Sequence, residues 1–219
     1  MAGEFLIFGH RGSPRRQPEN TVASFEEALR AGADGFETDL RLLSDKTAVL
    51  FHDDEFGGRT IESLSANDFA NYPYFQRLRD LAQFAGRATM VLEVKRSRWE
   101  DILLSEIAGW ENIIVASFDH ELVAELSRRR VGFPLGLTIS GSIVDLPAYA
   151  RRVGATWVFP NDRFVDADLV AALHRDQMRV VPWTPNRETE WDDLRAAGCD
   201  GVITDLPAEA VAWRNRNLR

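Results

Sequence analysis

Five short polar motifs within the first 95 residues hold the side chains best suited to chemistry in this chain. The apolar runs FLIFG, GADGF, TAVLF and TMVL lead into them. Charged and histidine side chains that follow a buried strand are typical of a catalytic rim, because buried runs carry folding while strand ends carry chemistry. The motifs are His10-Arg11-Gly12, Pro18-Glu19-Asn20-Thr21, Glu37-x-Asp39, His52-Asp53 and Glu93-x-Lys95. Together they supply the acid-base, metal-binding and anion-binding groups that metal-assisted cleavage of a phosphodiester requires.

His10 and His52 are the candidate acid and base. Imidazole exchanges a proton near neutral pH, so two such groups can serve opposite sides of one phosphorus atom. Each of the two follows an apolar run and adjoins a charged residue. A single histidine after a strand is more often structural, and it is the repeated pattern that favours catalysis. His120 and His174 lie in helical stretches, where we expect structural roles.

Glu37, Asp39 and Glu93 form the candidate metal site. Glu37 and Asp39 are two residues apart, so on a strand both side chains point to the same face. Two carboxylates aimed at one space repel each other unless a cation lies between them. Glu93, at the end of a later strand, offers a third oxygen ligand. An all-oxygen set without histidine or cysteine favours one divalent cation, Mg²⁺ or Ca²⁺, over zinc.

Two cationic and two aromatic side chains complete the candidate substrate site. The guanidinium of Arg11 can bind two phosphate oxygens at once, and Lys95 can add a point charge. Either cation could instead neutralise the carboxylates as a structural ion pair. Phe118 and Trp183 follow later apolar runs, as does Asn186, and we expect all three at the rim of the site. A buried aromatic residue is, however, more often part of the core than a substrate contact.

Strand-like and helix-like segments alternate along most of the chain, which is the pattern of a parallel sheet. Candidate strands span 5–9, 34–40, 47–51, 89–94, 112–116, 133–138, 156–159, 179–183 and 200–204. Candidate helices span 20–31, 78–86, 99–109, 119–130, 142–153, 165–176, 187–197 and 207–216. About eight such units predict an α/β fold closed into a (β/α)8 TIM barrel, with a single domain over residues 1–219.

Two segments depart from a simple alternation. Nine candidate strands compete for eight places, and the link between the second and third is too short for a crossover helix, which needs about a dozen residues. One of these two strands should therefore be short or irregular. Residues 54–77 have weak periodicity, which predicts a loop-and-turn insertion on the catalytic rim. It ends in an aromatic cluster of Tyr72, Tyr74 and Phe75.

Composition limits the possible classes of protein. An apolar fraction of 45% over 219 residues supports a sizeable core and argues against disorder. The formal charge of −8, from 26 basic and 34 acidic residues, disfavours nonspecific binding to nucleic acid or anionic membranes. The chain contains no P-loop, no GxGxxG fingerprint and no GxSxG elbow. A P-loop nucleotide enzyme, a Rossmann domain and a serine hydrolase are therefore disfavoured.

The sequence also bears on the location of the protein. The first residues lack the basic region of a secretory signal, and no apolar stretch approaches the roughly 18 residues of a membrane span. A single cysteine, Cys199, excludes an intrachain disulfide, and we expect it to be an apolar filler rather than a nucleophile. These features predict a cytoplasmic protein with a small-molecule substrate, no nucleic-acid partner and no membrane span.

The order of these motifs resembles that of the glycerophosphodiester phosphodiesterase family. Any one motif is weak, whereas HRG, PENT, ExD, HD and ExK in this order are highly specific. The resemblance implies a TIM barrel that cleaves a glycerophosphodiester. It covers most of the chain, through FGHRGSPRRQPENTVASF, ADGFETDLRLLSD, AVLFHDD, MVLEVK, ASFD, PLGL, VVPWTPN and GCDGVITDLP.

The resemblance implies the same roles that the residue types suggest. It assigns the metal ligands to Glu37, Asp39 and Glu93, and the acid-base pair to His10 and His52. It assigns the phosphate contacts to Arg11 and Lys95, and an aromatic residue near the substrate to Trp183. The segment between the HD and ExK motifs is shorter than is usual in the family. The alcohol that is released is therefore left open. The sequence also does not show which histidine is the acid and which is the base.

The leading hypothesis is metal-dependent hydrolysis of glycerophosphodiesters, such as glycerophosphocholine, to an alcohol and glycerol 3-phosphate. Attack by the neighbouring glycerol hydroxyl, giving a cyclic phosphate, and direct attack by water both remain open. An alternative is lysophospholipase D-like or sphingomyelinase D-like activity, with the aromatic cluster lining a slot for a lipid chain. A third hypothesis, a non-catalytic domain that binds a phosphate ligand, is disfavoured because all seven key polar residues are present.

Overall fold

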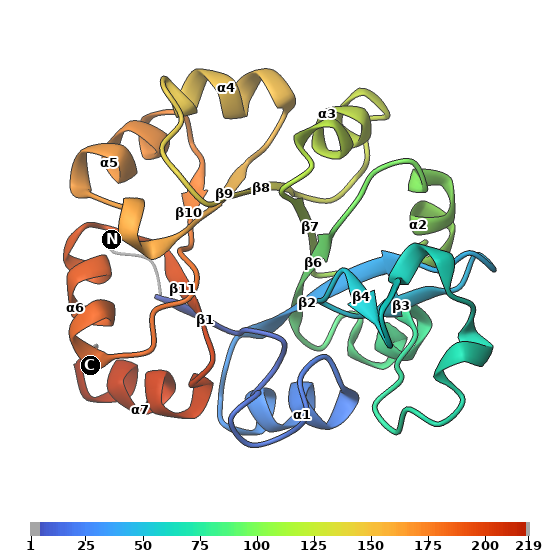
Figure 1. Ribbon diagram of the computed structural model, residues 1–219. Coiled ribbons are helices and arrows are strands. Elements are labelled where there is room, and N and C mark those ends of the chain that lie inside the picture. The colour runs from blue at the N-terminus through green and yellow to red at the C-terminus, as the bar shows by residue number, and fades with distance from the viewer. Residues whose placement is uncertain (1–4, 218–219) are drawn as a thin grey trace.

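The computed structural model describes residues 5–217, within which eight parallel strands form a nearly closed barrel surrounded by helices (Figure 1). The barrel strands are β1 (Leu6–Gly9), β2 (Gly35–Leu42), β6 (Thr89–Val94), β7 (Ile113–Ser117), β8 (Leu135–Ile139), β9 (Trp157–Pro160), β10 (Arg179–Val180) and β11 (Gly201–Thr204). They lie side by side in chain order, and parallel bridges from Trp183 to Asn161 and to Ile203 join the two ends. The predicted TIM barrel is confirmed.

Helices cover the outside of the barrel. They are α1 (Val22–Arg30), α2 (Glu100–Glu106), α3 (His120–Arg128), α4 (Leu146–Val153), α5 (Ala167–Arg175), α6 (Glu188–Ala196) and α7 (Pro207–Asn217). The segment predicted as a helix at 78–86 is instead the 3₁₀ helix η3 (Leu78–Phe84). Its buried residues Leu78, Leu81 and Phe84 are three apart, which is the period of a 3₁₀ helix. Within residues 5–217, no helix is long and apolar enough to cross a membrane.

The ninth candidate strand exists but is not a barrel strand. β3 (Ala48–Leu50) pairs antiparallel with the end of β2, so that Leu50 lies opposite Leu40 and Ala48 opposite Leu42. Antiparallel neighbours need only a short loop, which explains why the link leaves no room for a crossover helix.

Residues 54–77 form a compact insertion beside this hairpin. They contain the short hairpin of β4 (Glu55–Phe56) and β5 (Arg59–Thr60), followed by the 3₁₀ turns η1 (Ile61–Ser63) and η2 (Ala66–Phe69). The insertion has its own apolar cluster, which explains why a segment without periodicity is ordered. The cluster comprises Leu43, Val49, Ile61, Leu64 and Phe69, packed by Phe51, Phe56, Ala66, Tyr72 and Phe75.

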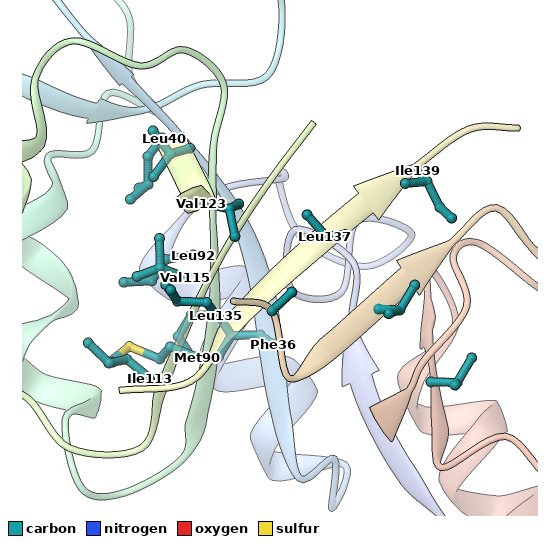
Figure 2. Close-up of a cluster of buried hydrophobic side chains, with 14 of the residues drawn as sticks. Phe36, Leu40, Met90, Leu92, Ile113, Val115, Val123, Leu135, Leu137 and Ile139 are labelled. Atoms are coloured by element: carbon teal, nitrogen blue, oxygen red, sulfur yellow. The ribbon is translucent and has the colours of Figure 1, made fainter. Parts of the chain in front are cut away.

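Alternation along the strands separates two apolar layers. Phe36 and Leu40 of β2 and Met90 of β6 point outward, into the layer between the sheet and the helices (Figure 2). The intervening residues Glu37 and Asp39 therefore point to the interior side of the barrel. That interior is filled by Phe8, Val91, Ile114, Ala116, Phe159, Val181 and Ile203.

Candidate active site

A cavity of about 180 Å³ opens at the carboxyl ends of the barrel strands. The structure brings nine of the ten residues expected in the site or at its rim to the cavity wall, although they come from distant parts of the chain. They are His10, Arg11, Glu37, Asp39, His52, Glu93, Lys95, Phe118 and Trp183. Five further residues line the cavity without having been selected from the sequence, namely Val91, Thr138, Phe159, Thr184 and Ile203.

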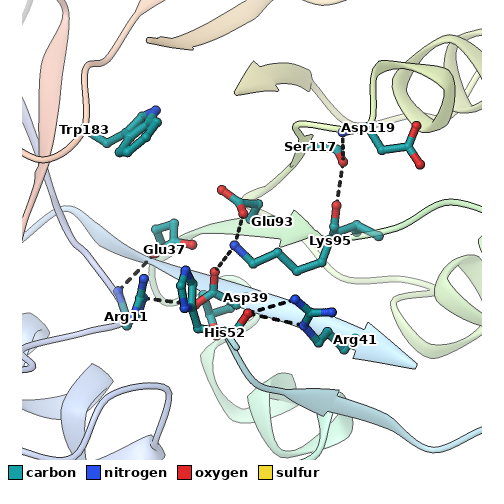
Figure 3. A network of polar contacts seen from close by, with 12 residues as sticks. Arg11, Glu37, Asp39, Arg41, His52, Glu93, Lys95, Ser117, Asp119 and Trp183 are labelled. Carbon is teal, nitrogen blue, oxygen red and sulfur yellow. Dashed lines mark hydrogen bonds and ion pairs between the residues drawn. The ribbon is translucent and has the colours of Figure 1, made fainter. Parts of the chain in front are cut away.

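Glu37, Asp39 and Glu93 converge at the mouth of the barrel (Figure 3). One oxygen atom of each lies within 4.8 Å of the others, and all three residues are buried. Strand register explains the arrangement, because Glu37 and Asp39 share one face of β2 and Asp39 pairs with Glu93 of β6. Three carboxylates at this separation form an oxygen site that could hold a metal ion.

The carboxyl groups perturb one another strongly. Burial and the charge of Asp39 raise the pKa of Glu37 to about 8. Burial also raises the pKa of Glu93, against the opposing charge of Lys95. Burial acts in the same direction on Asp39, but Lys95 and Arg11 outweigh it and lower the pKa of Asp39 to about 2. If ionised together, three buried acids beside two cations would carry a surplus of negative charge. Protonation of Glu37, whose pKa is raised, relieves this surplus, and a divalent cation that prefers oxygen ligands would relieve it on binding.

Lys95 and Arg11 neutralise part of this charge. Lys95 Nζ lies 2.6 Å from Asp39 Oδ1 and also contacts Glu93. Arg11 Nε lies 3.2 Å from Asp39 Oδ2, and Arg11 Nη1 donates to both carboxylate oxygens of Glu19 at 3.0 Å. The ion pairs considered from the sequence are therefore present. Within residues 5–217, Arg11 Nε is a buried nitrogen that faces the Asp39 carboxylate without making a hydrogen bond to it.

The turn after β1 holds Arg11 in a left-handed conformation. Arg11 has a φ of 51° and Gly12 a φ of 89°, and a Cβ atom at Gly12 would lie 2.4 Å from Ser24 Oγ. Ser24 Oγ donates to the Arg11 carbonyl at 2.9 Å and accepts from the Ser13 N–H at 2.7 Å. The first helix thus stabilises an unfavourable backbone conformation. In this conformation the Arg11 N–H donates to Glu37 Oε2 at 3.0 Å.

Asn20 of the PENT motif fixes the Asp39 carboxylate. Asn20 Nδ2 donates to Asp39 Oδ2 at 2.8 Å, and Asn20 Oδ1 accepts from Thr38 Oγ1 at 2.8 Å. Asn20 has a φ of 55°, a conformation that asparagine tolerates better than most residues. The PENT motif therefore orients one carboxylate of the candidate metal site through Asn20.

His10 is held by Asp205, which the sequence analysis did not select. Asp205 Oδ1 lies 2.7 Å from His10 Nδ1, and His10 Nε2 lies 4.0 Å from Glu37 Oε2. Burial alone would lower the pKa of His10, but the hydrogen bond to Asp205 and the charge of Glu37 raise it above its ordinary value. Strand register explains the contact between His10 and Asp205. Gly9 at the end of β1 pairs with Thr204 at the end of β11, and His10 and Asp205 directly follow these two residues.

Asn186 fixes Asp205 in turn. Asn186 Nδ2 donates to Asp205 Oδ2 at 3.0 Å. Asn186 Oδ1 accepts from Thr204 Oγ1 and from the Asp205 N–H, both at 2.9 Å. Asn186, expected at the rim, therefore supports the site through Asp205 instead of lining the cavity.

His52 lies in a different setting, and a buried arginine holds its backbone. His52 Nδ1 lies 2.8 Å from Asp53 Oδ1, and the Asp53 side chain is 72% exposed. Arg41 shares the interior face of β2 with the carboxylates, and its Nη2 donates to the His52 carbonyl at 3.0 Å (Figure 3). The Arg41 guanidinium also contacts Asp54 at 2.5 Å and Glu62 at 2.8 Å. It therefore ties the His52 segment to both β2 and the insertion.

Phe118 and Trp183 form an aromatic wall of the cavity. Their ring centroids lie 5.6 Å apart at an interplanar angle of 84°. Trp183 Nε1 donates to the Phe159 carbonyl at 2.9 Å, which fixes the indole ring. Phe118 is 42% exposed, so part of this wall remains open to a ligand.

His120, His174 and Cys199 do not line the catalytic cavity. His120 bonds the Tyr149 hydroxyl at 2.9 Å, and His174 pairs with Asp200 at 2.9 Å. Burial raises the pKa of the Cys199 thiol to about 12. These contacts agree with the structural roles expected from the sequence.

Two histidines, a carboxylate cluster and anion-binding cations at the mouth of a TIM barrel define the site of a phosphate-ester hydrolase. The chain belongs to the glycerophosphoryl diester phosphodiesterase family, whose family model matches residues 10–86 and 83–209. The protein is accordingly an enzyme, a phosphoric diester hydrolase. The family resemblance noted from the sequence motifs is confirmed.

Relatives of known sequence and structure extend over almost the whole chain. A glycerophosphodiester phosphodiesterase of Bacillus altitudinis is 27% identical over 95% of this chain and 97% of its own. One of Caldanaerobacter subterraneus subsp. tengcongensis is 26% identical over 94% of this chain and 96% of its own. The structure of an Oleispira antarctica phosphodiesterase in complex with the product sn-glycerol-3-phosphate has a TM-score of 0.88 at 18% identity, covering 96% of each chain. At that identity it shows a shared fold.

Proposed function

We propose that this enzyme hydrolyses glycerophosphodiesters, such as glycerophosphocholine, to an alcohol and glycerol 3-phosphate with one divalent cation, Mg²⁺ or Ca²⁺. The observation that carries the proposal is the convergence of two histidines, three buried carboxylates and two cations on one cavity. The names of the two bacterial relatives and the product bound to the Oleispira enzyme support this class of substrate.

The formal charges of the cavity suit this substrate. Glu37, Asp39 and Glu93 bring three negative charges when ionised, and Arg11 and Lys95 bring two positive ones. With all five groups ionised, the form in which the carboxylates would bind a cation, the protein contributes one net negative charge; without the cation, the rise in the pKa of Glu37 to about 8 keeps that carboxyl largely protonated near neutral pH. A divalent cation reverses the sign of the net charge and makes the cavity attractive to a phosphodiester anion.

Glu37, Asp39 and Glu93 would hold the cation. When bound, such an ion polarises the phosphoryl group as a Lewis acid. Arg11 and Lys95, which both line the cavity, bind and orient the phosphoryl oxygens. Phe118 and Trp183 are the proposed aromatic contacts, which exclude water from one side of the substrate.

His10 and His52 transfer the protons. Because Nδ1 of each ring contacts an aspartate, Nε2 is the nitrogen that each can offer to the substrate. One histidine accepts the proton of the attacking hydroxyl, which belongs to water or to the glycerol moiety. The other donates a proton to the departing alkoxide.

The wider predictions from the sequence remain proposals. We propose a single domain over residues 1–219 and a small-molecule substrate. We also propose a cytoplasmic location, which rests on the lone, unpaired Cys199.

Phosphorus NMR of the reaction products tests the proposed function. The enzyme should convert glycerophosphocholine to glycerol 3-phosphate, lose activity in excess EDTA and regain it with Mg²⁺ or Ca²⁺. Full activity in EDTA would refute the role of the cation, and no product from any glycerophosphodiester would refute the function. Lysophosphatidylcholine belongs in the same series, because comparable release of choline from it favours the lysophospholipase D-like alternative.

A further inference from the structure

A second, smaller pocket adjoins the catalytic cavity at His52. It has a volume of about 70 Å³, and its wall includes Glu19, Asp53, Tyr72 and Tyr74. His52 lines both this pocket and the catalytic cavity. The two pockets therefore lie next to each other at His52, and we call the smaller one the Tyr72–Tyr74 pocket.

The two tyrosines form an aromatic corner. Their ring centroids lie 5.7 Å apart at an interplanar angle of 89°. The Tyr72 ring is anchored, since it packs against Phe56 at 5.2 Å and Phe51 at 6.3 Å. Tyr74 is 45% exposed and can adjust to a ligand. The faces of such rings attract cations because of the ring quadrupole.

The charges around this pocket also favour a cation. Its described wall contains the carboxylates of Glu19 and Asp53 but neither lysine nor arginine. Burial raises the pKa of Tyr72, and Glu19, Tyr74 and Asp53 add to this rise in that order, so both carboxylates act on the pocket. Glu19 bonds Arg11 and Asp53 bonds His52, but a carboxylate can accept several hydrogen bonds and keeps capacity for a ligand.

A third cavity on the rim provides the contrast. It has a volume of about 570 Å³ and also includes His52, but its wall carries Arg41, Lys95 and Arg96 together with three aspartates. Opposite charges are mixed there, so it has no clear preference for the sign of a ligand. Of these three cavities, which all include His52, the Tyr72–Tyr74 pocket combines aromatic faces with carboxylates and no lysine or arginine.

We propose that the Tyr72–Tyr74 pocket binds an alkylammonium group, so that the preferred substrates are diesters of amino alcohols. The proposal rests on the function proposed above. It places the leaving alcohol on the side of His52. His52 Nε2 then donates its proton to the departing oxygen as the bond from phosphorus to the amino alcohol breaks. His10 Nε2 accepts the proton of the attacking hydroxyl as its oxygen bonds to phosphorus.

Phe75, grouped with the two tyrosines in the sequence, does not line the pocket. Its ring stacks on Phe69 at 4.9 Å and 25°, and Arg77 lies over it at 5.8 Å. Changing Phe75 would disturb the core of the insertion and would report on stability. The exposed Tyr74 is therefore the better residue for a test.

The test compares two diesters that differ in charge but not in shape. One is glycerophosphocholine, and the other carries 3,3-dimethylbutanol, the uncharged isostere of choline. The wild-type ratio of kcat/KM should favour choline by about 5- to 30-fold, the size of a desolvated cation–aromatic contact. Choline is also the more acidic leaving alcohol, but this intrinsic difference is the same for every variant, and a general loss of catalysis cancels in the ratio. The change in the ratio between wild type and variant therefore reports on the pocket.

Tyr74→Ala should lower the ratio at least threefold, whereas Tyr74→Phe should keep it because the ring face remains. Phe164→Ala is the matched control, since Phe164 is also 45% exposed and lines none of the three cavities. A wild-type ratio near one, or a ratio that Tyr74→Ala leaves unchanged, overturns the pocket assignment. Hydrolysis of neither diester would overturn the proposed function instead.

Discussion

The contact between His10 and Asp205 gives a sharp prediction, because Asn186 determines what an amide can do in place of the carboxylate. In Asp205→Asn, the new side chain must turn its oxygen toward Asn186 Nδ2, which is a donor. Asn186 cannot turn over in response, since its own oxygen accepts two hydrogen bonds at 2.9 Å. The amide nitrogen of residue 205 therefore faces His10 Nδ1 and donates to it. The proton of a neutral His10 ring moves to Nε2, and the nitrogen that faces the substrate can no longer accept one.

The expected size follows from this hydrogen bond. A hydrogen bond to a charged partner contributes about 1.5–3 kcal/mol, which corresponds to a loss of roughly 10- to 150-fold in kcat. Because Asp205 does not line the catalytic cavity, KM should change little. Asp53→Asn should cost less, since Asp53 is 72% exposed and Asp205 only 19%, and solvent screens the exposed pair.

Steady-state kinetics with glycerophosphocholine measure the effect, and circular dichroism checks that both variants fold. The control is Asp200→Asn, which changes a similar aspartate–histidine pair far from the cavity and should keep the wild-type kcat. A folded Asp205→Asn enzyme with kcat within threefold of wild type would refute the argument. So would a larger loss in Asp53→Asn than in Asp205→Asn.

Three further predictions follow from the site. Glu37→Gln should abolish most divalent-cation binding, measured by isothermal titration calorimetry, because a neutral amide removes one of three buried charges; wild-type affinity would contradict the metal site. His10→Ala and His52→Ala should each lower kcat by about 100-fold or more, the usual scale for a positioned acid or base, while His174→Ala should resemble wild type. Cys199 should react with iodoacetamide at pH 8 only after denaturation, since its pKa is raised to about 12; rapid labelling of the native enzyme, followed by mass spectrometry, would contradict its burial.

Much of the barrel could be predicted because its information is local. The interior and exterior residues of β2 alternate, so the sequence GFETDL already separates Phe36 and Leu40 from Glu37 and Asp39. The antiparallel place of β3 could not be predicted in this way, since an isolated apolar run does not show the direction of its partner. That the insertion folds into a defined structure could not be predicted either, because its aromatic residues pack as a cluster and follow neither a helical nor a strand period in the sequence.

The missed residues share a physical reason. Asp205 stands just before α7, where an acidic residue is commonly a helix N-cap, and only the register of β1 with β11 reveals that it meets His10. A cue was nevertheless present, since Asp205 follows the apolar run GVIT as His10 follows FLIFG. Arg41 was missed for a similar reason. It lies on the same face of β2 as the carboxylates, but its acidic partners Asp54 and Glu62 come from the insertion, and the sequence does not show that these segments meet.

These contacts divide the site into two halves with different mechanical supports. His10 and the three carboxylates belong to β1, β2 and β6 and to the residues that follow them, where strand register fixes their positions. His52 instead lies between the barrel and the insertion, and Arg41 joins it to both. The Tyr72–Tyr74 pocket is built on that same insertion. A change in the insertion can therefore alter the alcohol that is accepted while the carboxylates and His10 keep their geometry.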